Sequence, residues 1–328
     1  MDATATPYAG LTPDRVLDAL EHLGLRGDGR VLTLNSYENR VYQVGIEHAL
    51  PVIAKFYRPG RWSDEAIREE HEFVRELAEH ELPVSAPLSI AGRTLHFVEG
   101  HRIAVYPRQG GRAPEFTYRA TLEWMGRLLG RLHAVGALHR YQARPTLDIA
   151  TFGREPRDYL LSSGFIPADL LEAWRSVIDD ALRGVERCYE RAGDIQTLRL
   201  HGDCYAGNIL WSGDGPHFVD FDDSRMGPAV QDLWMLLSGD RTEMQRQLGW
   251  ALDGYDQFHA FDARELHLIE ALRTLRLIHY SGWIARRWND PAFPAAFPWF
   301  GTQRYWQDRV LELREQIALM DEEPLRPT

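Results

Sequence analysis

Residues 199–225 read R-L-H-G-D-C-Y-A-G-N-I-L-W-S-G-D-G-P-H-F-V-D-F-D-D-S-R, and they alternate short apolar runs with polar groups. This alternation predicts a strand, a polar loop, a second strand, a tight turn and a third strand. The turn is segment 212–215, because its glycines tolerate the positive φ that tight turns need. We therefore expect short strands whose ends carry the polar side chains of this stretch.

Four polar side chains stand at the ends of these apolar runs: His201, Asp203, Asn208 and Asp220. A carboxylate at the end of a buried strand is costly unless a cation or hydrogen-bond donors meet it. Three of the four side chains bear oxygen, and oxygen ligands suit a hard divalent cation such as Mg²⁺. The stretch therefore indicates a polar site that could hold magnesium.

The pattern H-G-D-x-x-x-x-N, followed by an apolar strand and D-x-D, resembles the core of the choline kinase and aminoglycoside phosphotransferase group. That group shares the protein-kinase fold, and the step from Asp203 to Asn208 is the one found in the kinase motif H-R-D-x-x-x-x-N. Within the group, three further segments resemble the RdoA family of bacterial stress response kinases: N-S-Y-E-N-R-V-Y-Q (35–43), G-P-A-V-Q-D-L-W-M-L-L (227–237) and R-R-W-x-D-P-A-F-P (286–294). The resemblance covers nearly the whole chain.

The resemblance implies an α+β, bilobal protein-kinase-like fold. Residues 1–107 would form a small N-lobe with an antiparallel sheet, and residues 108–328 would form a mostly helical C-lobe. The stretch 107–111 is the most linker-like in the chain, and we expect the hinge there. In a kinase-like fold, main-chain groups near Val105 and Pro107 would meet the adenine edge of ATP.

The composition of the 328 residues limits the classes of function. A net charge of −11 argues against a dedicated binder of nucleic acid or of anionic membranes. The two cysteines suggest neither a disulfide framework nor a zinc site. No signal peptide and no run of about twenty apolar residues is visible. We therefore expect a cytoplasmic protein. We also expect the protein to be a monomer.

The segment Asn35-Ser36-Tyr37-Glu38 lies between two strand-like runs, 30–34 and 39–44. A protein kinase would have a glycine-rich phosphate loop at this place, but this segment contains no glycine. Backbone amides and the Ser36 hydroxyl would have to meet the phosphate oxygens instead. The alternative is a plain hairpin turn, since Asn and Ser are turn formers. The resemblance favours Ser36 as a nucleotide contact.

A lysine and a glutamate are predicted to pair in the first lobe. Lys55 lies inside the apolar strand 52–57, where a lysine needs an anionic partner unless it reaches out to solvent. Helix 63–81 places Glu70 on its inward stripe with Ile67, Val74 and Leu77. We expect Glu70 to pair with Lys55, as a strand lysine pairs with a helix glutamate in kinases. Glu69 and Glu72 should face solvent.

The second lobe contributes fewer candidate residues. Helix 117–135 should end in a packed core histidine, His133, and Asp232 should bond backbone amides of the catalytic loop. Only about ten residues separate Asp220 from the helix at 230–234, so we expect no long activation segment. The aromatic residues between 280 and 306, with Arg286 and Arg287, fit either an acceptor groove or a packed core with surface arginines.

The resemblance implies a role for each residue of the site. Asp203 would orient the acceptor hydroxyl and take its proton. Asn208 and Asp220 would hold Mg²⁺ between the β- and γ-phosphates of ATP, so Asp220 counts as both catalytic and metal-binding. Lys55 would anchor the α- and β-phosphates while Glu70 fixes Lys55. The role of Asp222 is left open between metal and support.

The leading hypothesis is an ATP-dependent kinase that phosphorylates Ser or Thr hydroxyls of proteins, an acceptor class implied by the resemblance alone. The runner-up is a kinase of small molecules such as amino alcohols, sugars or antibiotics. A third hypothesis is a nucleotide-binding module without catalysis. A fourth is a metal-dependent hydrolase that uses His201, Asp203 and Asp220, although hydrolase sites usually contain more histidines.

Overall fold

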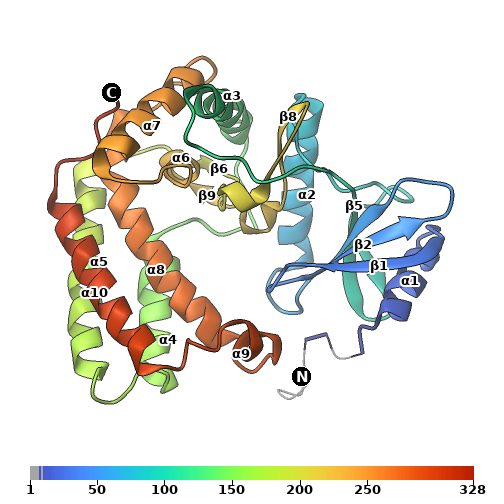
Figure 1. Ribbon diagram of the computed structural model, residues 1–328, viewed down its shortest axis with the longest axis horizontal. Coiled ribbons are helices and arrows are strands. Elements are labelled where there is room, and N and C mark those ends of the chain that lie inside the picture. The colour runs from blue at the N-terminus through green and yellow to red at the C-terminus, as the bar shows by residue number, and fades with distance from the viewer. Residues whose placement is uncertain (1–6, 9) are drawn as a thin grey trace. The chain divides into compact units, whose positions relative to one another are not determined.

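The computed structural model of the chain describes residues 7–8 and 10–328 (Figure 1). Residues 1–6 and 9, at the start of the predicted N-lobe, lie outside the described residues. The beginning of the N-terminal stretch in which no signal peptide was expected therefore lies outside them too. The chain forms two compact units. The first comprises Met1–Glu115, Tyr141–Arg144 and Asp203–Ser224, and the second Phe116–Arg140, Pro145–Gly202 and Arg225–Thr328. A division into two lobes at residue 107 stays a prediction.

The first unit contains a five-stranded antiparallel sheet in the order β1-β2-β3-β5-β4. Its strands are β1 Gly27–Leu34, β2 Arg40–Ile46, β3 Val52–Phe56, β4 His96–Val98 and β5 His101–Pro107. Helix α1 (Pro13–His22) begins at the N-cap Thr12 and contributes Val16 and Leu20 to a core cluster with Val44, Phe56 and Ile103 of the sheet. The strands predicted at 30–34, 39–44 and 52–57 are present as β1, β2 and β3, with ends shifted by a few residues.

Helix α2 (Asp64–Glu79) belongs to the same unit and follows its sequence pattern closely. The Ser63 hydroxyl accepts a hydrogen bond from the backbone N–H of Ala66, which caps the first turn. Ile67, Val74 and Leu77 are buried on one stripe, and Glu70 is buried among them. A glutamate on this stripe must find a cationic partner inside the protein.

The stretch around Asn208 packs into the first unit through backbone pairing. Strands β7 (Ile209–Ser212) and β8 (Gly215–Phe218) form a two-stranded sheet. Phe218 bridges to Val84, and Trp211 exchanges backbone hydrogen bonds with Arg112 at 3.1 and 2.8 Å. Gly111 makes this approach possible, since a Cβ at this position would lie 2.9 Å from the Leu210 carbonyl carbon. The segment after the H-G-D motif is therefore held against Val84 and Arg112 by backbone hydrogen bonds and bridges.

The second unit is mainly helical. Its helices are α3 Arg119–Gly136, α4 Glu155–Ser163, α5 Leu171–Ala192, α6 Val230–Trp234, α7 Arg241–Tyr255, α8 Ile269–Arg286, α9 Ala292–Ala296 and α10 Gln303–Asp321. Two short strands, β6 (Leu198–Arg199) and β9 (Met226–Gly227), pair antiparallel. A π turn, Ala150–Arg154, and a 3₁₀ turn, Ala263–Leu268, lie in this unit, while the 3₁₀ turns Ala206–Asn208 and Phe221–Asp223 lie in the first.

One predicted helix break is wrong. The sequence predicts a pair of helices over roughly 155–192, with Pro167 and Gly184 as breaks, but α5 runs through Gly184. A Cβ at Gly184 would lie 2.7 Å from the Met320 methyl carbon of α10. This glycine is therefore a point of close helix packing, and a glycine inside a helix costs only about 1 kcal/mol relative to alanine.

Helices α3 and α7 approach each other through glycines. A Cβ on Gly126 would lie 1.9 Å from the carbonyl oxygen of Ala251, and one on Gly254 would lie 2.1 Å from that of Glu123. The two helices can keep this spacing only while these positions lack a side chain.

We expect the substitution Gly126→Ala to lower the free energy of unfolding by about 1–3 kcal/mol, because the new methyl group must push a backbone carbonyl aside. Urea unfolding of the purified variant measures this. Gly301→Ala is the matched control, since a Cβ at Gly301 meets nothing within 4 Å. Equal stability of the two variants would show that α3 and α7 can separate without cost.

The predicted α+β class is confirmed: an antiparallel sheet and many helices are present in the described chain. Among residues 7–8 and 10–328, none of the helices has the length and apolar character needed to cross a bilayer.

Candidate active site

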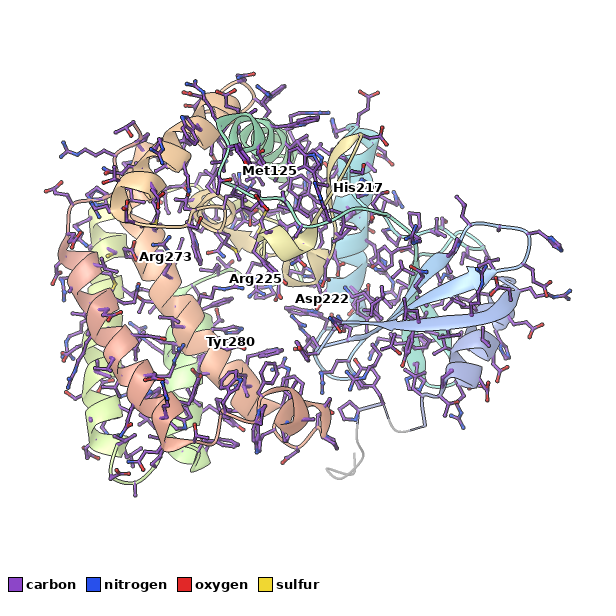
Figure 2. All side chains as sticks on the ribbon, viewed as in Figure 1. Met125, His217, Asp222, Arg225, Arg273 and Tyr280 are labelled. Atoms are coloured by element: carbon purple, nitrogen blue, oxygen red, sulfur yellow. The ribbon has the colours of Figure 1, made fainter. Side chains whose placement is uncertain are left out.

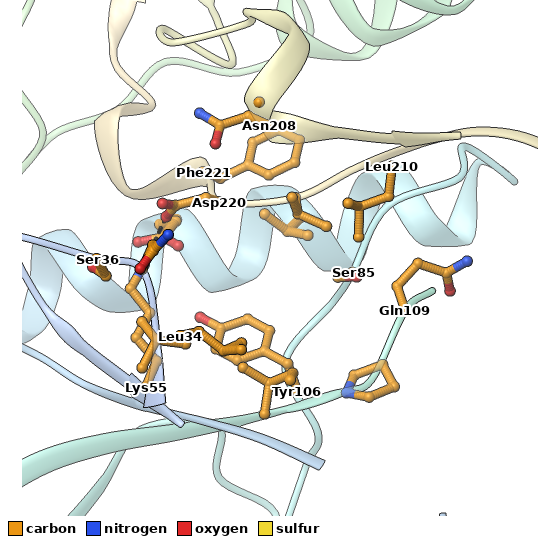
Figure 3. Close-up of a pocket in the computed structure, with 18 residues that line it drawn as sticks. Leu34, Ser36, Lys55, Ser85, Tyr106, Gln109, Asn208, Leu210, Asp220 and Phe221 are labelled. Atoms are coloured by element: carbon orange, nitrogen blue, oxygen red, sulfur yellow. Dashed lines mark hydrogen bonds and ion pairs between the residues drawn. The ribbon is translucent and has the colours of Figure 1, made fainter. Parts of the chain in front are cut away.

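A pocket of about 300 Å³ lies within the first unit (Figure 3). Leu34 of β1 and Leu210 of β7 line opposite sides of it, and other apolar side chains continue both walls. One end is polar and contains Lys55, Asn208 and Asp220. A pocket with apolar walls and a few polar groups at one end suits a flat base that carries a charged tail.

Most of the residues predicted for the site meet in this pocket. Its lining includes Ser36, Lys55, Glu70, Pro107, Asn208 and Asp220. Val105 does not contribute: it is fully buried in the sheet, and its carbonyl oxygen accepts a hydrogen bond from the Leu88 N–H at 2.7 Å. Tyr106 and Gln109 line the pocket instead. Strand alternation could have selected Tyr106, since neighbours on a strand face opposite sides.

Asp203 joins the site through Asn208. The side-chain amide of Asn208 donates to the Asp203 backbone oxygen at 2.9 Å and to Asp203 Oδ2 at 3.1 Å. The 3₁₀ turn Ala206–Asn208 folds the motif back on itself and makes this contact possible. Because the amide nitrogen is used by Asp203, the amide oxygen of Asn208 is the atom that remains for a cation.

Asp220 has an unusual backbone and an accessible side chain. Its φ is 60°, in the left-handed region that few non-glycine residues adopt. Residues held in such regions are enriched at active sites, because the surrounding structure must compensate for their strain. The side chain is 51% exposed, so its carboxylate can be reached by a ligand.

Lys55 forms two ion pairs with the segment that contains Asp220. Its Nζ lies 3.2 Å from Asp220 Oδ1 and 3.0 Å from Asp222 Oδ1. Burial disfavours the ammonium form, but the charges of Asp222 and Asp220 outweigh burial and hold the pKa of Lys55 well above its ordinary value. The lysine is therefore a permanent cation at the polar end of the pocket.

The predicted ion pair between Lys55 and Glu70 is wrong, because each residue pairs with another partner. Glu70 Oε2 lies 2.8 Å from Arg144 Nη2, and both side chains are almost completely buried. Burial raises the pKa of Glu70, although the charges of Lys55 and Arg144 oppose this shift. The helix stripe located Glu70 correctly, but nothing in the local pattern indicated that an arginine 74 positions away would reach it.

Arg144 connects helix α2 to the segment that follows Asp220. Its guanidinium donates to the carbonyl oxygens of Ala66, Asp222 and Ser224 at 2.7, 3.0 and 2.6 Å. Glu69, which was expected to face solvent, supports the same loop by accepting hydrogen bonds from the backbone N–H groups of residues 142–144. The sequence offered no signal for Arg144, because it stands in a short loop without periodicity.

Two arginines hold the glycine-free loop that contains Ser36. Arg58 Nε lies 2.9 Å from Glu38 Oε1, and the Arg58 backbone N–H donates to Asn39 Oδ1 at 3.1 Å. Arg61 Nη1 lies 3.3 Å from Glu38 Oε2. Ion pairs and hydrogen bonds of these side chains therefore hold the loop in its conformation, and the conformational freedom of glycine is not needed.

In the second unit, Asp232 holds the backbone that leads into the H-G-D motif. Its carboxylate accepts from the N–H groups of His201 at 2.8 Å and Gly202 at 2.9 Å, and it contacts His133 Nε2 at 3.1 Å. Burial opposes its charge, but these hydrogen bonds lower the pKa of Asp232. The predicted backbone role of Asp232 and the core position of His133 are both confirmed.

A buried glutamate caps the helix that carries Asp232. Glu265 Oε2 accepts a hydrogen bond from the Val230 N–H at the start of α6, at 2.8 Å. Only 4% of Glu265 is exposed. Burial raises the pKa of Glu265 from 4.5 to about 7, although the backbone hydrogen bonds oppose the shift.

We expect Glu265 to make the protein less stable as pH rises. The folded state keeps the proton of Glu265 up to about pH 7 while the unfolded state loses it near 4.5, so between these values the folded state binds more protons. The variant Glu265→Gln should therefore gain stability relative to the wild type by up to about 3 kcal/mol on going from pH 5 to pH 8. Urea unfolding at both pH values measures this difference. A difference that shrinks or stays constant with pH would contradict the prediction.

Aromatic side chains of α8 and α9 pack against one another, among them Tyr280 of α8, which is labelled in Figure 2. The rings of Tyr280 and Trp283 are stacked, with their centroids 5.7 Å apart, and Trp283 contacts Phe297 edge to face. Arg287 lies 5.4 Å above the Trp283 ring. These contacts describe mutual packing of rings and arginines, and an acceptor groove formed by the same residues stays a prediction.

Comparison with known proteins places the chain in a family. The sequence model described as "Phosphotransferase enzyme family" matches residues 30–269. Stress response kinase A from Salmonella choleraesuis (strain SC-B67) is 45% identical over 328 residues, which is 100% of this chain and 99% of that protein. The chain belongs to the phosphotransferase enzyme family. The serine/threonine protein kinase RdoA from Salmonella typhimurium (strain LT2) is 44% identical over the same span, with 100% and 99% of the two proteins covered.

The fold of this phosphotransferase agrees with solved structures of kinases. The amicoumacin kinase hAmiN, solved in complex with AMP-PNP, Ca²⁺ and "Ami", aligns with a TM-score of 0.72 at 19% identity. The alignment covers 96% of this chain and 95% of that one. A likeness at such low identity shows the fold alone, which is the predicted protein-kinase-like fold.

The donor atoms of the phosphotransferase site fit a metal ion that arrives with a nucleotide. Among the described residues, no group of three or more His, Cys, Asp or Glu side chains is arranged to hold a metal ion. Mg²⁺ needs few protein ligands when substrate phosphates and water complete its shell. The Asn208 amide oxygen and the accessible Asp220 carboxylate are such a sparse, oxygen-only pair.

Proposed function

We propose that this phosphotransferase is an ATP-dependent protein kinase that transfers the γ-phosphoryl group of ATP to Ser or Thr hydroxyls. The observation that carries the proposal is the full-length identity of 44–45% to proteins named stress response kinase A and serine/threonine protein kinase RdoA. The pocket of the first unit supports it, since Lys55, Asn208 and Asp220 meet at its polar end.

Each residue has a role that follows from its position. The apolar walls bind the adenine ring, whose edge meets main-chain groups between Pro107 and Gln109. Lys55 binds the α- and β-phosphates as a buried cation. The Ser36 loop covers the phosphate tail. Kinases in general assign these roles to residues in the same way, and most of their catalysis comes from positioning the reactants and neutralising charge.

Asp203 acts on the acceptor. Its carboxylate orients the attacking hydroxyl and accepts the proton that the hydroxyl loses as the new oxygen–phosphorus bond forms. Asn208 keeps Asp203 in place through the contact at 3.1 Å. Mg²⁺, when bound by Asn208 and Asp220, would neutralise charge on the phosphate oxygens.

Transfer of label from ATP tests the proposal. Purified protein is incubated with γ-³²P-ATP, Mg²⁺ and either an extract of proteins freed of small molecules or a pool of small amino alcohols and sugars. We expect label in protein bands, on phosphoserine or phosphothreonine. Label found only in small molecules would show that the acceptor is a metabolite, and no label beyond that of an Asp203→Asn control in either arm would show that the chain does not catalyse transfer.

A further inference from the structure

The 328-residue sequence contains 37 Lys and Arg residues. Lys55 is the only lysine among them, and all the others are arginines. Arginine therefore serves at every other Lys or Arg position, including the buried ones at 58, 144, 199 and 225. The two side chains differ: an ammonium is a compact point charge, whereas a guanidinium is a broad planar fork. Position 55 thus requires a compact cation, and the residues that hold this cation matter for the site.

Asp222 has the geometry of a permanent partner for Lys55. Its Oδ1 lies 3.0 Å from Lys55 Nζ, and its Oδ2 lies 2.7 Å from Arg61 Nη1. Only 5% of the side chain is exposed. Each carboxylate oxygen therefore faces one cation inside the protein, and this arrangement fixes the direction in which Lys55 extends.

Asp220 and Glu70 do not have this geometry. Asp220 contacts Lys55 at 3.2 Å, but its side chain is half exposed, and in the proposed function it is taken by the magnesium–nucleotide complex. Glu70 is bound to Arg144 at 2.8 Å. When nucleotide binds, Asp222 is therefore the carboxylate that stays with Lys55.

We propose that Asp222 is the positioning residue of Lys55, and that it replaces the helix glutamate in this role. The inference rests on the proposed function, since it assumes that Lys55 binds nucleotide phosphates. Asp222 touches no substrate; it acts by holding the ammonium group toward the pocket. Without it, Lys55 would keep Asp220 as its remaining close carboxylate partner and would compete with the metal for that carboxylate.

Arg61 extends the same arrangement to the Ser36 loop. Arg61 Nη1 lies 2.7 Å from Asp222 Oδ2 and 3.3 Å from Glu38 Oε2. Arg61 Nη2 lies 2.9 Å from Asp223 Oδ1. Glu38 in turn belongs to the loop that contains Ser36. Asp222 thus occupies the centre of a buried chain of charges that runs from the phosphate-binding lysine to the loop expected to cover the phosphates.

Three isosteric variants test the role of Asp222. Asp222→Asn removes the charge that faces Lys55, and Asp223→Asn is the matched control, because Asp223 shares Arg61 but has no ion pair with Lys55. Glu70→Gln tests the alternative partner. We expect Asp222→Asn to raise the KM for ATP and the magnesium concentration for half-maximal rate by roughly tenfold or more, with a smaller change in kcat. Asp223→Asn should change the KM for ATP by less than about threefold, and Glu70→Gln should raise it less than Asp222→Asn does.

The single lysine provides a direct readout. Protein grown with ¹³C-lysine has one labelled side chain, so its ε-carbon NMR signal reports on Lys55 alone. We expect this signal to shift in Asp222→Asn and to move less in Glu70→Gln, because Glu70 is paired with Arg144 and acts on Lys55 only through space. A Glu70→Gln signal that moves to the position found in the urea-unfolded protein would overturn the proposal, and this test stands even if Asp222→Asn does not fold.

The kinetic outcomes are equally sharp. A Glu70→Gln variant with a KM for ATP raised as much as that of Asp222→Asn would return the role to the helix glutamate. If the folded Asp222→Asn variant has an unchanged KM for ATP, Asp222 has only a structural role and the proposal is wrong. Wild-type protein that binds no ATP analogue at all would instead refute the proposed function, so the two failures are distinguishable.

Discussion

Replacing Asp203 with asparagine is expected to lower the rate of phosphoryl transfer by roughly 10²–10⁴-fold, because the acceptor hydroxyl loses its general base. Asparagine has nearly the same shape, and its oxygen can still accept the hydrogen bond that Asn208 donates at 3.1 Å. The loop should therefore keep its structure while the proton acceptor disappears. The loss should fall on kcat rather than on the KM for ATP.

The measurement is the initial rate of label transfer from ATP, together with the affinity for a non-hydrolysable ATP analogue. Affinity should be unchanged, since Asp203 is not part of the pocket lining formed by Lys55, Asn208 and Asp220. A thermal unfolding curve like that of the wild type would show that the fold is intact. Full activity of Asp203→Asn would assign the proton acceptor to another group.

Replacing Asp220 with asparagine should remove both transfer and magnesium-dependent nucleotide binding. We expect a loss of transfer on the order of 10²–10³-fold, because charge on the phosphate oxygens is no longer neutralised at this point. Asparagine is chosen over alanine because Asp220 has a φ of 60°, and asparagine tolerates this left-handed conformation. The backbone at 220 should therefore stay in place, and the effect should report the lost carboxylate.

Titration of a fluorescent ATP analogue at increasing Mg²⁺ concentrations separates the two acids. In the wild type and in Asp203→Asn, affinity should rise with Mg²⁺. In Asp220→Asn this rise should be much smaller, while binding without metal should be retained through Lys55, which still pairs with Asp222 at 3.0 Å. Identical binding curves for both variants at all Mg²⁺ concentrations would contradict the assignment of Asp220 as the metal ligand.

Much of the local structure could be read from short patterns of residues. Helix α2 was predicted over 63–81 with Glu70 on its buried stripe, and both the helix and the buried glutamate are present. The H-G-D motif was predicted to meet a D-x-D segment, and Asn208 and Asp220 do line one pocket. These predictions succeeded because helix and strand periods depend on neighbours within a few positions, and buried polar groups stand out against such periods.

The partners of the charged groups could not be predicted in this way. Lys55 pairs with Asp222, 167 positions later in the sequence, by a contact that the strand pattern around residue 55 does not contain. Glu69 looked solvated on its helix, yet it holds the backbone of residues 142–144. Gly184 looked like a helix break, but it marks where α10 packs against α5.

Sequence pattern and the family resemblance thus predicted helix α2, its buried stripe and most of the residues that meet in the pocket. Three-dimensional packing alone chose the ion-pair partners within the first unit, where Arg144 takes Glu70 and leaves Asp222 to Lys55. The reason is physical: burial follows from a residue's own period, whereas an ion pair follows from the distances among all charges that folding brings within a few ångströms, and those distances depend on the whole chain.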